Sequence, residues 1–140
     1  MKRVWCVLMS VILFLSGIEL SVQARTDEYL SYEGLNYTVI NDGFAAISRY
    51  TGRDEKVIIP DEIDGHIVIH IEDIAFSGCQ NITSVEVPES VTSIGWGAFR
   101  DCVNLVNINL PSTITKIGEY AFYNCANLET INLPDGISCI

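Results

Sequence analysis

Hydrophobic and polar positions repeat along the second half of the chain with a period of 23 residues. The unit reads PESVTSIGWGAFRDCVNLVNINL over residues 88–110 and returns as PSTITKIGEYAFYNCANLETINL over residues 111–133. The same slots are filled less regularly over residues 60–87, and residues 134–140 open a further copy. Self-similarity at a fixed period of this length is typical of a solenoid, in which each repeat forms one coil.

Three segments are predicted within each repeat. Residues 105–110 alternate between apolar and polar and predict a short strand, which ends at Pro111 because proline has no N–H for a sheet. Residues 91–94 predict a second strand-like segment, and residues 96–102 predict a helical or 3-10 turn. One set of positions is expected to face the core of each coil, namely Val91, Ile94, Ala98, Phe99, Cys102, Leu105, Ile108 and Leu110.

Residues 37–59 differ from the repeats and are predicted to cap them. They hold two β-rich runs on either side of Asn41-Asp42-Gly43, which together predict a β-hairpin, followed by a short strand over residues 56–59. Such a cap is needed because the first coil would otherwise leave its apolar core open to water. Residues 60–87 form a longer first repeat, in which Asp64-Gly65 is expected to make a turn that bulges out of the coil.

The repeated unit, written IxxIGxxAFxxCxxLxxIxLP, resembles the BspA-type leucine-rich repeat over roughly residues 37–140. Proteins of this family occur largely on the surface of, or are secreted by, host-associated bacteria and some protists. The resemblance implies an α/β-type, mostly β solenoid, a right-handed coil that binds proteins or glycans without catalysis. It carries over no functional residue, because the signature positions of the family are structural.

The N-terminus has the layout of a secretory signal peptide. Met1-Lys2-Arg3 is basic, residues 4–18 are apolar, and small residues end the segment at Ala24, after which we expect cleavage. The apolar run of about 15 residues is short of the roughly 20 needed to span a bilayer, and Glu19 follows it. A cleaved signal over residues 1–24 is therefore favoured over a membrane anchor. The mature protein would begin with a linker, residues 25–36, and be secreted or held at the cell surface.

The chain is acidic, with 8 Lys and Arg against 18 Asp and Glu and a formal net charge of −10. Removal of the signal peptide leaves 6 basic and 17 acidic residues, a net charge of −11. An acidic surface argues against nucleic acid and against anionic membranes as partners. Charge alone does not identify the partner that the protein binds.

No catalytic or metal-binding motif is found in the sequence. His66 and His70 lie among acidic residues, but in a strand-like segment they would be roughly 13 Å apart, too far to share one zinc ion. Serine, threonine and cysteine have no His–acid partner at a fixed position of the repeat, so nucleophilic catalysis has no support. We therefore expect neither an enzyme nor a cofactor.

Cys79, Cys102 and Cys125 occupy the same slot in successive repeats. Successive coils of a solenoid lie about 4.8 Å apart, so these side chains are expected to stack in parallel along one inner edge. Parallel side chains have poor geometry for a disulfide, and buried free thiols are the better interpretation. Cys139 falls in an exposed slot and is expected to react.

Two outward-facing surfaces are candidate interaction sites. The first is the predicted strand of each repeat (residues 105–110 and their counterparts), whose outward polar side chains suit an extended partner. The second, named the turn edge, is the predicted helical or 3-10 turn (residues 96–102 and their counterparts), which offers residue types that are enriched at binding hot spots. The turn-edge residues have an alternative interpretation as simple spacers between core positions. The candidates are Glu86, Asn107, Asn109, Thr130 and Asn132 on the strand and Trp96, Arg100, Tyr120 and Tyr123 on the turn edge.

Two functions remain open from the sequence. The chain is either an interaction module that binds a host or microbial protein or glycan, as in adhesion, or a structural segment or truncated fragment of a longer surface protein with no partner of its own. Nothing polar follows residues 134–140 to cap the last complete coil. An open apolar end is a template for another chain, so self-association through the C-terminal coil is also expected.

Overall fold

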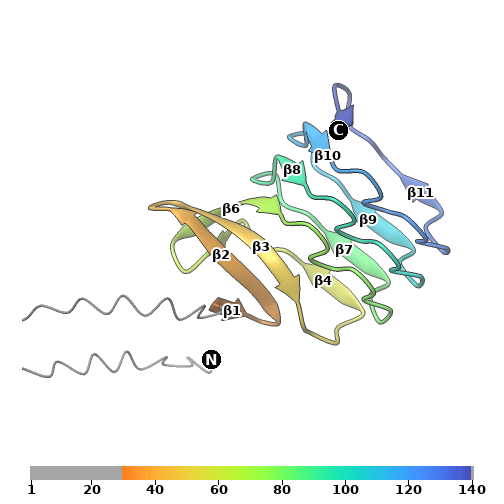
Figure 1. The fold of residues 1–140 in the computed structure, drawn as a ribbon, viewed down its shortest axis with the longest axis horizontal. Coiled ribbons are helices and arrows are strands. Elements are labelled where there is room, and N and C mark those ends of the chain that lie inside the picture. Colours follow the sequence, from red (N-terminus) through yellow and green to blue (C-terminus); the bar gives the residue numbers. More distant parts are fainter. Residues whose placement is uncertain (1–29, 140) are drawn as a thin grey trace, which may run out of the picture.

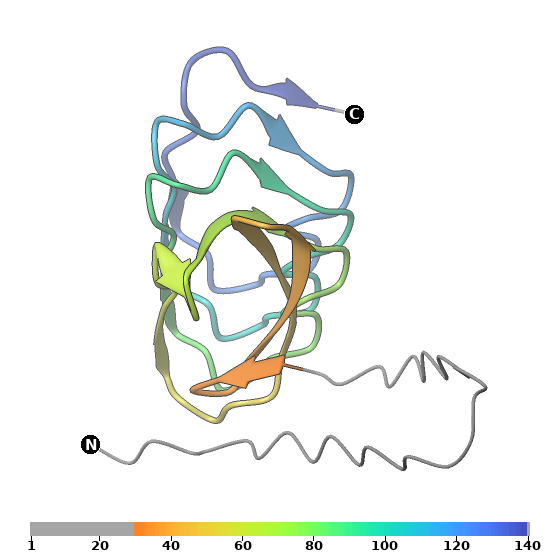
Figure 2. The same cartoon turned by 90° about the vertical axis from the view of Figure 1, so that its left-hand side faces the viewer.

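The computed structural model of the protein describes residues 30–139. The predicted signal peptide and its cleavage site lie outside these residues, as do Ile140 and residues 25–29 of the predicted linker. The described chain winds into a mostly β solenoid (Figure 1). Figure 2 shows the coils stacked on one another, with the hairpin of the cap lying across one end.

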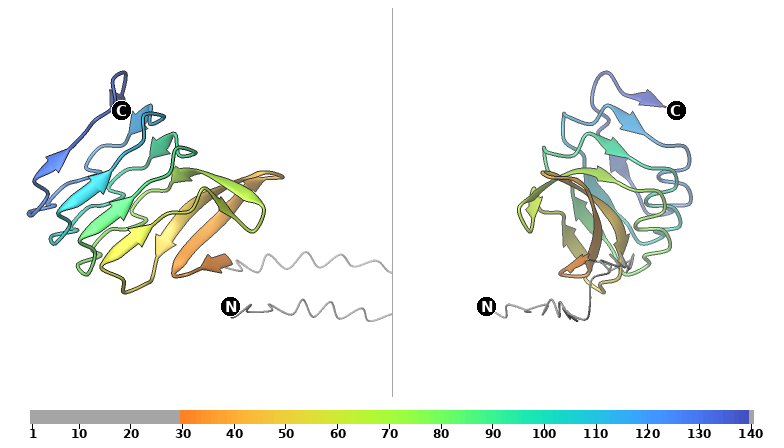
Figure 3. Two further views of the ribbon diagram at one scale, coloured as in Figure 1. Left: turned by 180° about the vertical axis from the view of Figure 1, so that it is seen from behind. Right: turned by 60° about the vertical axis from the view of Figure 1, so that its left-hand side comes forward.

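Two sheets form two sides of the solenoid. The larger sheet contains, in spatial order, β1 (Leu30–Tyr32), β2 (Leu35–Asn41), β3 (Phe44–Tyr50), β6 (His66–Ile71), β8 (Ser93–Ile94), β10 (Lys116–Ile117) and β12 (Ser138–Cys139), with β5 (Glu62–Ile63) paired to β6. The smaller sheet contains β4 (Lys56–Ile58), β7 (Ser84–Glu86), β9 (Asn107–Asn109) and β11 (Thr130–Ile131). These four strands run parallel, side by side (Figure 3).

The strand register confirms the 23-residue repeat. Ser93 of β8 pairs with Lys116 of β10, and Asn107 of β9 pairs with Thr130 of β11, so these residues lie beside their counterparts in the next coil. The register shifts by one residue at β12, where Lys116 pairs with Ser138. The eight positions predicted to face the core in the second coil are all buried, with Leu110 the most exposed of them at 7%. The hydrophobic pattern therefore assigned the core correctly.

The third side of each coil consists of turns and not of the predicted helical or 3-10 segment, and residues 30–139 contain no helix. Within residues 97–102, every second N–H donates to a carbonyl three residues earlier, and the N–H groups between them donate to the next coil. The inter-coil bonds run from Gly97 to Glu119, from Phe99 to Ala121 and from Asp101 to Tyr123. Gly97 and Asp101 have positive φ angles of 55° and 59°, which interrupt a helical backbone and direct alternate N–H groups toward the next coil.

The N-terminal cap begins earlier than predicted. Residues 30–36, which the sequence placed in a linker, form β1 and the start of β2, and Leu35 is buried. Their polarity is misleading because Glu33 and Gly34 form a tight turn with positive φ angles of 47° and 81°. Residues 56–58, placed in the cap, form β4, which pairs with β7 as the first strand of the smaller sheet.

The predicted hairpin is present, and it continues the larger sheet. β2 and β3 pair in antiparallel fashion, and β3 then pairs in parallel with β6 of the first coil. The longer first repeat holds the expected extra turn, in which β5 and β6 are antiparallel and Asp64 and Gly65 have φ angles of 49° and 83°. The hydroxyl of Tyr37 in β2 donates to the carboxylate of Asp64, which ties this turn to the cap.

A column of stacked aromatic rings joins the cap to the coils. Phe76, Phe99 and Phe122 occupy one slot in three successive coils, with ring centres 4.9 Å and 5.6 Å apart. Tyr50 at the end of β3 stacks on Phe76 at 5.4 Å and so closes the column on the cap side. None of the described residues belongs to a helix that is long and apolar enough to cross a membrane.

Candidate interaction surface

Aromatic and arginine side chains gather on the turn edge of the second and third coils. The ring of Tyr120 lies 6.0 Å from that of Trp96 and 5.8 Å from that of Tyr123, edge-on to both. The guanidinium carbon of Arg100 lies 5.9 Å from the centre of the Trp96 ring and 5.5 Å from that of Tyr123. These four residues are named the aromatic–arginine cluster below.

The cluster forms because two neighbouring coils fill their slots differently. Tyr120 occupies the slot that Gly97 holds in the coil before it, so the aromatic ring of one coil has no counterpart in the other. The position of a Cβ on Gly97 would be 3.6 Å from Cβ of Arg100 and 3.7 Å from its Cδ, so the arginine stem lies against this glycine. Gly97 also has a φ of +55°. The backbone conformation at this position therefore favours glycine, and the Arg100 side chain packs beside it.

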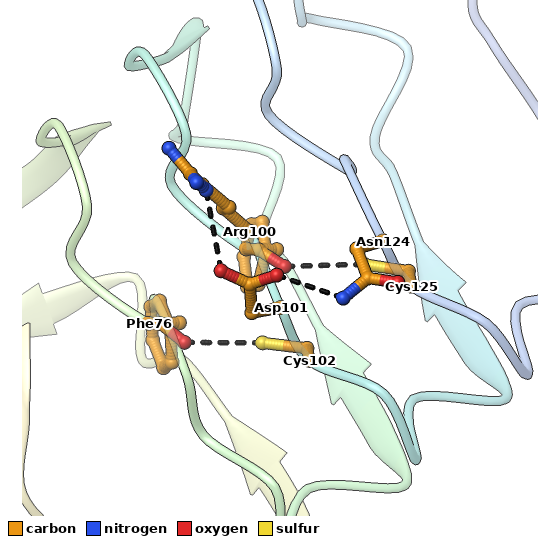
Figure 4. Close-up of polar contacts among 7 residues, drawn as sticks. Phe76, Arg100, Asp101, Cys102, Asn124 and Cys125 are labelled. Atoms are coloured by element: carbon orange, nitrogen blue, oxygen red, sulfur yellow. Dashed lines mark hydrogen bonds and ion pairs between the residues drawn. The ribbon is translucent and has the colours of Figure 1, made fainter.

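The cluster is exposed and yet held in place. Trp96 is 41% exposed, Tyr120 55% and Tyr123 53%. Nε of Arg100 donates to the carboxylate of Asp101 at 3.2 Å, and this carboxylate also accepts from the Asn124 side chain at 2.9 Å (Figure 4). These two contacts restrict the side chains of Arg100 and Asp101.

Sequence reasoning missed the polar residues that orient the cluster. Asp101 and Asn124 occupy the same slot in successive coils, and Asp73 is the counterpart of Trp96 in the coil before it. The main-chain N–H of Trp96 donates to Oδ1 of Asp73 at 2.7 Å. The 23-residue register, applied to polar positions as well as apolar ones, is the signal that would have found both contacts.

The strand candidates lie in two columns on the outer face of the smaller sheet. Ser84, Asn107 and Thr130 form one column. Glu86 and Asn109 pair in the other, and Asn132 follows β11 in the same slot. All five predicted strand residues are exposed, and the core residues of the strands alternate with them. They form a polar surface on a different side of the coil from the aromatic–arginine cluster, so the nine candidates make two separate surfaces.

Cysteines at one position of the repeat form a column that follows the turn edge of the coils. Sγ of Cys102 donates to the carbonyl oxygen of Phe76 at 3.0 Å, and Sγ of Cys125 donates to that of Phe99 at 3.1 Å (Figure 4). Cys79, Cys102 and Cys125 are free thiols, as predicted. Burial raises the pKa of all three thiols, that of Cys102 to about 12. The expected exposed slot of Cys139 is wrong, because β12 is shifted by one residue and Cys139 pairs with Ile117, which is buried, and not with Lys116. The side chain of Cys139 lies outside the described part of the chain, and its reactivity stays a prediction.

No group of three or more His, Cys, Asp or Glu within residues 30–139 is arranged to hold a metal ion. His70, one of the two histidines weighed as ligands, has Nδ1 at 2.8 Å from Oγ of Ser93 and 3.1 Å from the carbonyl oxygen of Ser93. These contacts join the first coil to the second.

Comparison with known proteins agrees with this architecture. The sequence profile of the BspA type leucine rich repeat region matches residues 53–140 in 6 copies. A leucine-rich repeat protein of T. pallidum is similar in structure, with 32% sequence identity and a TM-score of 0.73 over 79% of this chain and 52% of that one. A leucine-rich repeat protein of Bacteroides capillosus has 30% identity and a TM-score of 0.72 over 79% of this chain and 86% of its own.

A third similar structure is a leucine rich cell surface protein of Faecalibacterium prausnitzii, with 31% identity and a TM-score of 0.65. The alignment covers 71% of this chain and 28% of that one. The chain therefore spans about half of the T. pallidum protein and a smaller share of the F. prausnitzii protein. No curated protein matches the sequence.

Proposed function

Because the chain belongs to the BspA-type leucine-rich repeat family, we propose that it is a non-catalytic interaction module that binds a protein or glycan outside the cell. The N-terminal segment with the layout of a signal peptide supports secretion or attachment to the cell surface. The likeness to a leucine rich cell surface protein of F. prausnitzii supports the same location. Adhesion to a host or microbial macromolecule is the role that fits this location.

The aromatic–arginine cluster is the observation that carries the proposal. Tryptophan, tyrosine and arginine are the residue types most enriched at binding hot spots, because each combines a large apolar area with a polar tip. Here three rings and one guanidinium are contiguous, and at least two of the rings are more than half exposed. A guanidinium stacked on rings also presents its remaining donors to a partner. This composition favours a protein surface as the partner of the cluster.

A structural role is the second candidate function, and one observation favours it. The N–H groups of Tyr120, Phe122 and Asn124 correspond to those that link the earlier coils, and they have no main-chain acceptor among residues 30–139. Leu133 in the same coil is 56% exposed. A further coil or a second copy of the chain would satisfy these donors and cover the apolar surface. Self-association through the C-terminal coil is the form that this role would take.

A binding screen with the intact chain separates the two functions. The chain is immobilised and exposed to purified extracellular matrix proteins, mucins and defined glycans, and its own oligomeric state is measured by sedimentation velocity. An interaction module is expected to give saturable binding to at least one of these molecules while it sediments as a monomer. Concentration-dependent oligomers with no saturable binding would contradict the first function and favour the structural one.

A further inference from the structure

Two arginines line a pocket where the cap meets the first coil. Arg49 lies near the end of β3, Arg53 lies in the loop that follows, and both contribute to a cavity of about 650 Å³. Side chains that can hydrogen-bond complete its polar lining, among them Asn36, Gln80 and Asn81. No aspartate or glutamate is among the described residues that line this cavity. The side chains that line it therefore offer guanidinium, amide, hydroxyl and thiol groups, the thiol from Cys79.

The positive charge of this pocket is unusual for the chain. The protein has 18 Asp and Glu against 8 Lys and Arg. Within the part of the chain that the structure describes, the ion pair that forms joins Arg100 to Asp101, so neither Arg49 nor Arg53 is neutralised by a carboxylate there. Two arginines without an ion-pair partner that line one cavity attract an anion, since a guanidinium can donate two parallel hydrogen bonds to a carboxylate or a similar oxyanion.

The pocket continues along the solenoid into a second one. Arg53, Gln80 and Asn81 line both cavities, and the second, of about 610 Å³, extends to Asn104 and Asn127. Glu55 is the acidic residue among those that line the second cavity. Asn81, Asn104 and Asn127 occupy one slot in three successive coils, so this groove carries one asparagine for each coil.

Hydrogen bonds hold this row of amides in place. Nδ2 of Asn104 donates to the carbonyl oxygen of Gln80 at 2.8 Å, and Nδ2 of Asn127 lies 3.4 Å from Oδ1 of Asn104. Each amide keeps further donor and acceptor capacity, because it has two N–H groups and two lone pairs. A hydroxyl group likewise both donates and accepts, which makes a row of amides suited to a partner that carries many hydroxyls.

The main chain beside the groove argues against a peptide. The N–H of Thr83 donates to the carbonyl of Glu55, and that of Val106 donates to the carbonyl of Thr83. The loop after β3 and the turns that lead into β7 and β9 are thereby joined in a row, as Figure 1 shows. A peptide that binds as an added strand needs free N–H and carbonyl groups at an edge, and here these groups are already used between coils.

We infer that this groove, from Arg49 and Arg53 along Asn81, Asn104 and Asn127, binds an acidic glycan. The two arginines bind a carboxylate or sulfate group, and the asparagines bind the hydroxyls of the sugars that follow along the solenoid. The site lies apart from the aromatic–arginine cluster, so it does not depend on the function proposed for the cluster. It also explains why an acidic protein keeps two arginines without an ion-pair partner at one junction, within the residues that the structure describes.

Fluorescence anisotropy with the intact chain tests this inference. The labelled probes are a heparin hexasaccharide, which carries sulfates, a galacturonate hexasaccharide, which carries carboxylates alone, and neutral maltohexaose. At least one acidic probe is expected to bind, more weakly at high salt, while maltohexaose does not. Comparison of the two acidic probes identifies the anionic group. An Arg53→Ala variant is expected to lose about tenfold or more in affinity, and Arg53→Lys should lose less because it keeps the charge but not the planar fork.

Two controls make the result specific. Lys116→Ala removes one positive charge from a different side of the coil and is expected to change affinity by less than about twofold, since exposed distant charges are screened. Arg100→Ala alters the aromatic–arginine cluster and should leave glycan binding unchanged, which separates this inference from the proposed function. Arg49→Gln replaces Arg53→Ala if thermal melting shows that the latter does not fold.

Three outcomes would overturn the inference. The first is the absence of binding to both acidic hexasaccharides at millimolar concentration. The second is an equal loss of affinity in Arg53→Ala and Lys116→Ala, which would indicate a general charge effect. The third is binding of a hexaglutamate peptide as tight as that of the acidic glycans, which would assign the site to an acidic peptide.

Discussion

The thiol of Cys102 donates a hydrogen bond to the carbonyl oxygen of Phe76 across the boundary between the first and second coils, at 3.0 Å. The same carbonyl accepts from the main-chain N–H of Cys79 at 3.1 Å, so the thiol supplies its second hydrogen bond. Cys125 repeats the contact with Phe99 one coil later. The cysteine slot therefore fills the core and also links each coil to the one before it.

This relationship predicts an alkaline loss of stability. Burial holds the pKa of Cys102 at about 12, above the ordinary value of 9.0. Between these values the unfolded chain has lost the thiol proton and the folded chain retains it, so the free energy of unfolding falls as pH rises. Below pH 9 both states are protonated, and the group has no effect.

The check is the midpoint of thermal unfolding at pH 8, 9.5 and 10.5. The wild-type midpoint is expected to fall across this series, and Cys102→Ala should fall less steeply because it lacks the thiol. The other buried thiols and Tyr37, whose pKa burial and Asp64 raise to about 12, leave a residual slope in the variant. Parallel slopes for the two proteins would show that Cys102 keeps an ordinary pKa in the folded state.

A glycine in the repeat sets the distance between coils. A Cβ on Gly95 would lie 2.5 Å from the main-chain nitrogen of Asp73 and 2.7 Å from the carbonyl carbon of Glu72, so the two coils would have to separate. Gly95→Ala is therefore expected to destabilise the protein by about 1–3 kcal/mol, the usual cost of overpacking. Gly43→Ala is the control, because nothing lies within 4 Å of its Cβ position. Urea unfolding that gave the two variants equal midpoints would contradict the coil spacing.

The assignment of inward and outward positions makes a further prediction. Phe99 is fully buried in the aromatic column, and Phe99→Asp places an unpaired charge there, which is expected to cost about 4 kcal/mol or more and to unfold the coils. Glu129→Lys on the exposed face of the third coil should change stability by less than about 0.5 kcal/mol. Far-UV circular dichroism during thermal unfolding compares the two, and a folded Phe99→Asp protein with a wild-type midpoint would refute the register.

The core and the register could be predicted because the same position can be compared between successive repeats of this one sequence. Phe76, Phe99 and Phe122 recur at one spacing, and a position that stays apolar in several coils has to face the core. The turn edge was misassigned as helical because Phe99 and Cys102, three residues apart, satisfy a helical turn and an inter-coil turn equally well. A helical turn and an inter-coil turn differ in their hydrogen bonds, because in the inter-coil turn alternate N–H groups donate to the next coil. The spacing of residues within one repeat contains no information about these bonds.

The cap and the cluster show where sequence reasoning reaches its limit. Leu35 lies in a mostly polar stretch, and its burial depends on pairing with Tyr50, 15 residues later along the hairpin. The residue types of the aromatic–arginine cluster were identified from the sequence. Their association was not, because Trp96 and Tyr120 occupy different slots of the repeat and meet only through the packing of two coils.

The proposal that the chain is an interaction module is tested most directly at Tyr123. Its ring is exposed, contacts Tyr120 and lies beside the Arg100 guanidinium, so Tyr123→Ala removes a central part of the cluster without opening the core. Tyr32→Ala is the matched control, because Tyr32 is 40% exposed in the cap, outside the cluster. The measurement is the affinity of both variants and the wild type for a protein that binds in the screen, by biolayer interferometry.

We expect Tyr123→Ala to lose about tenfold or more in affinity, as hot-spot residues do, while Tyr32→Ala keeps the wild-type affinity and both variants keep the wild-type melting temperature. Wild-type affinity in the Tyr123→Ala variant would contradict the account.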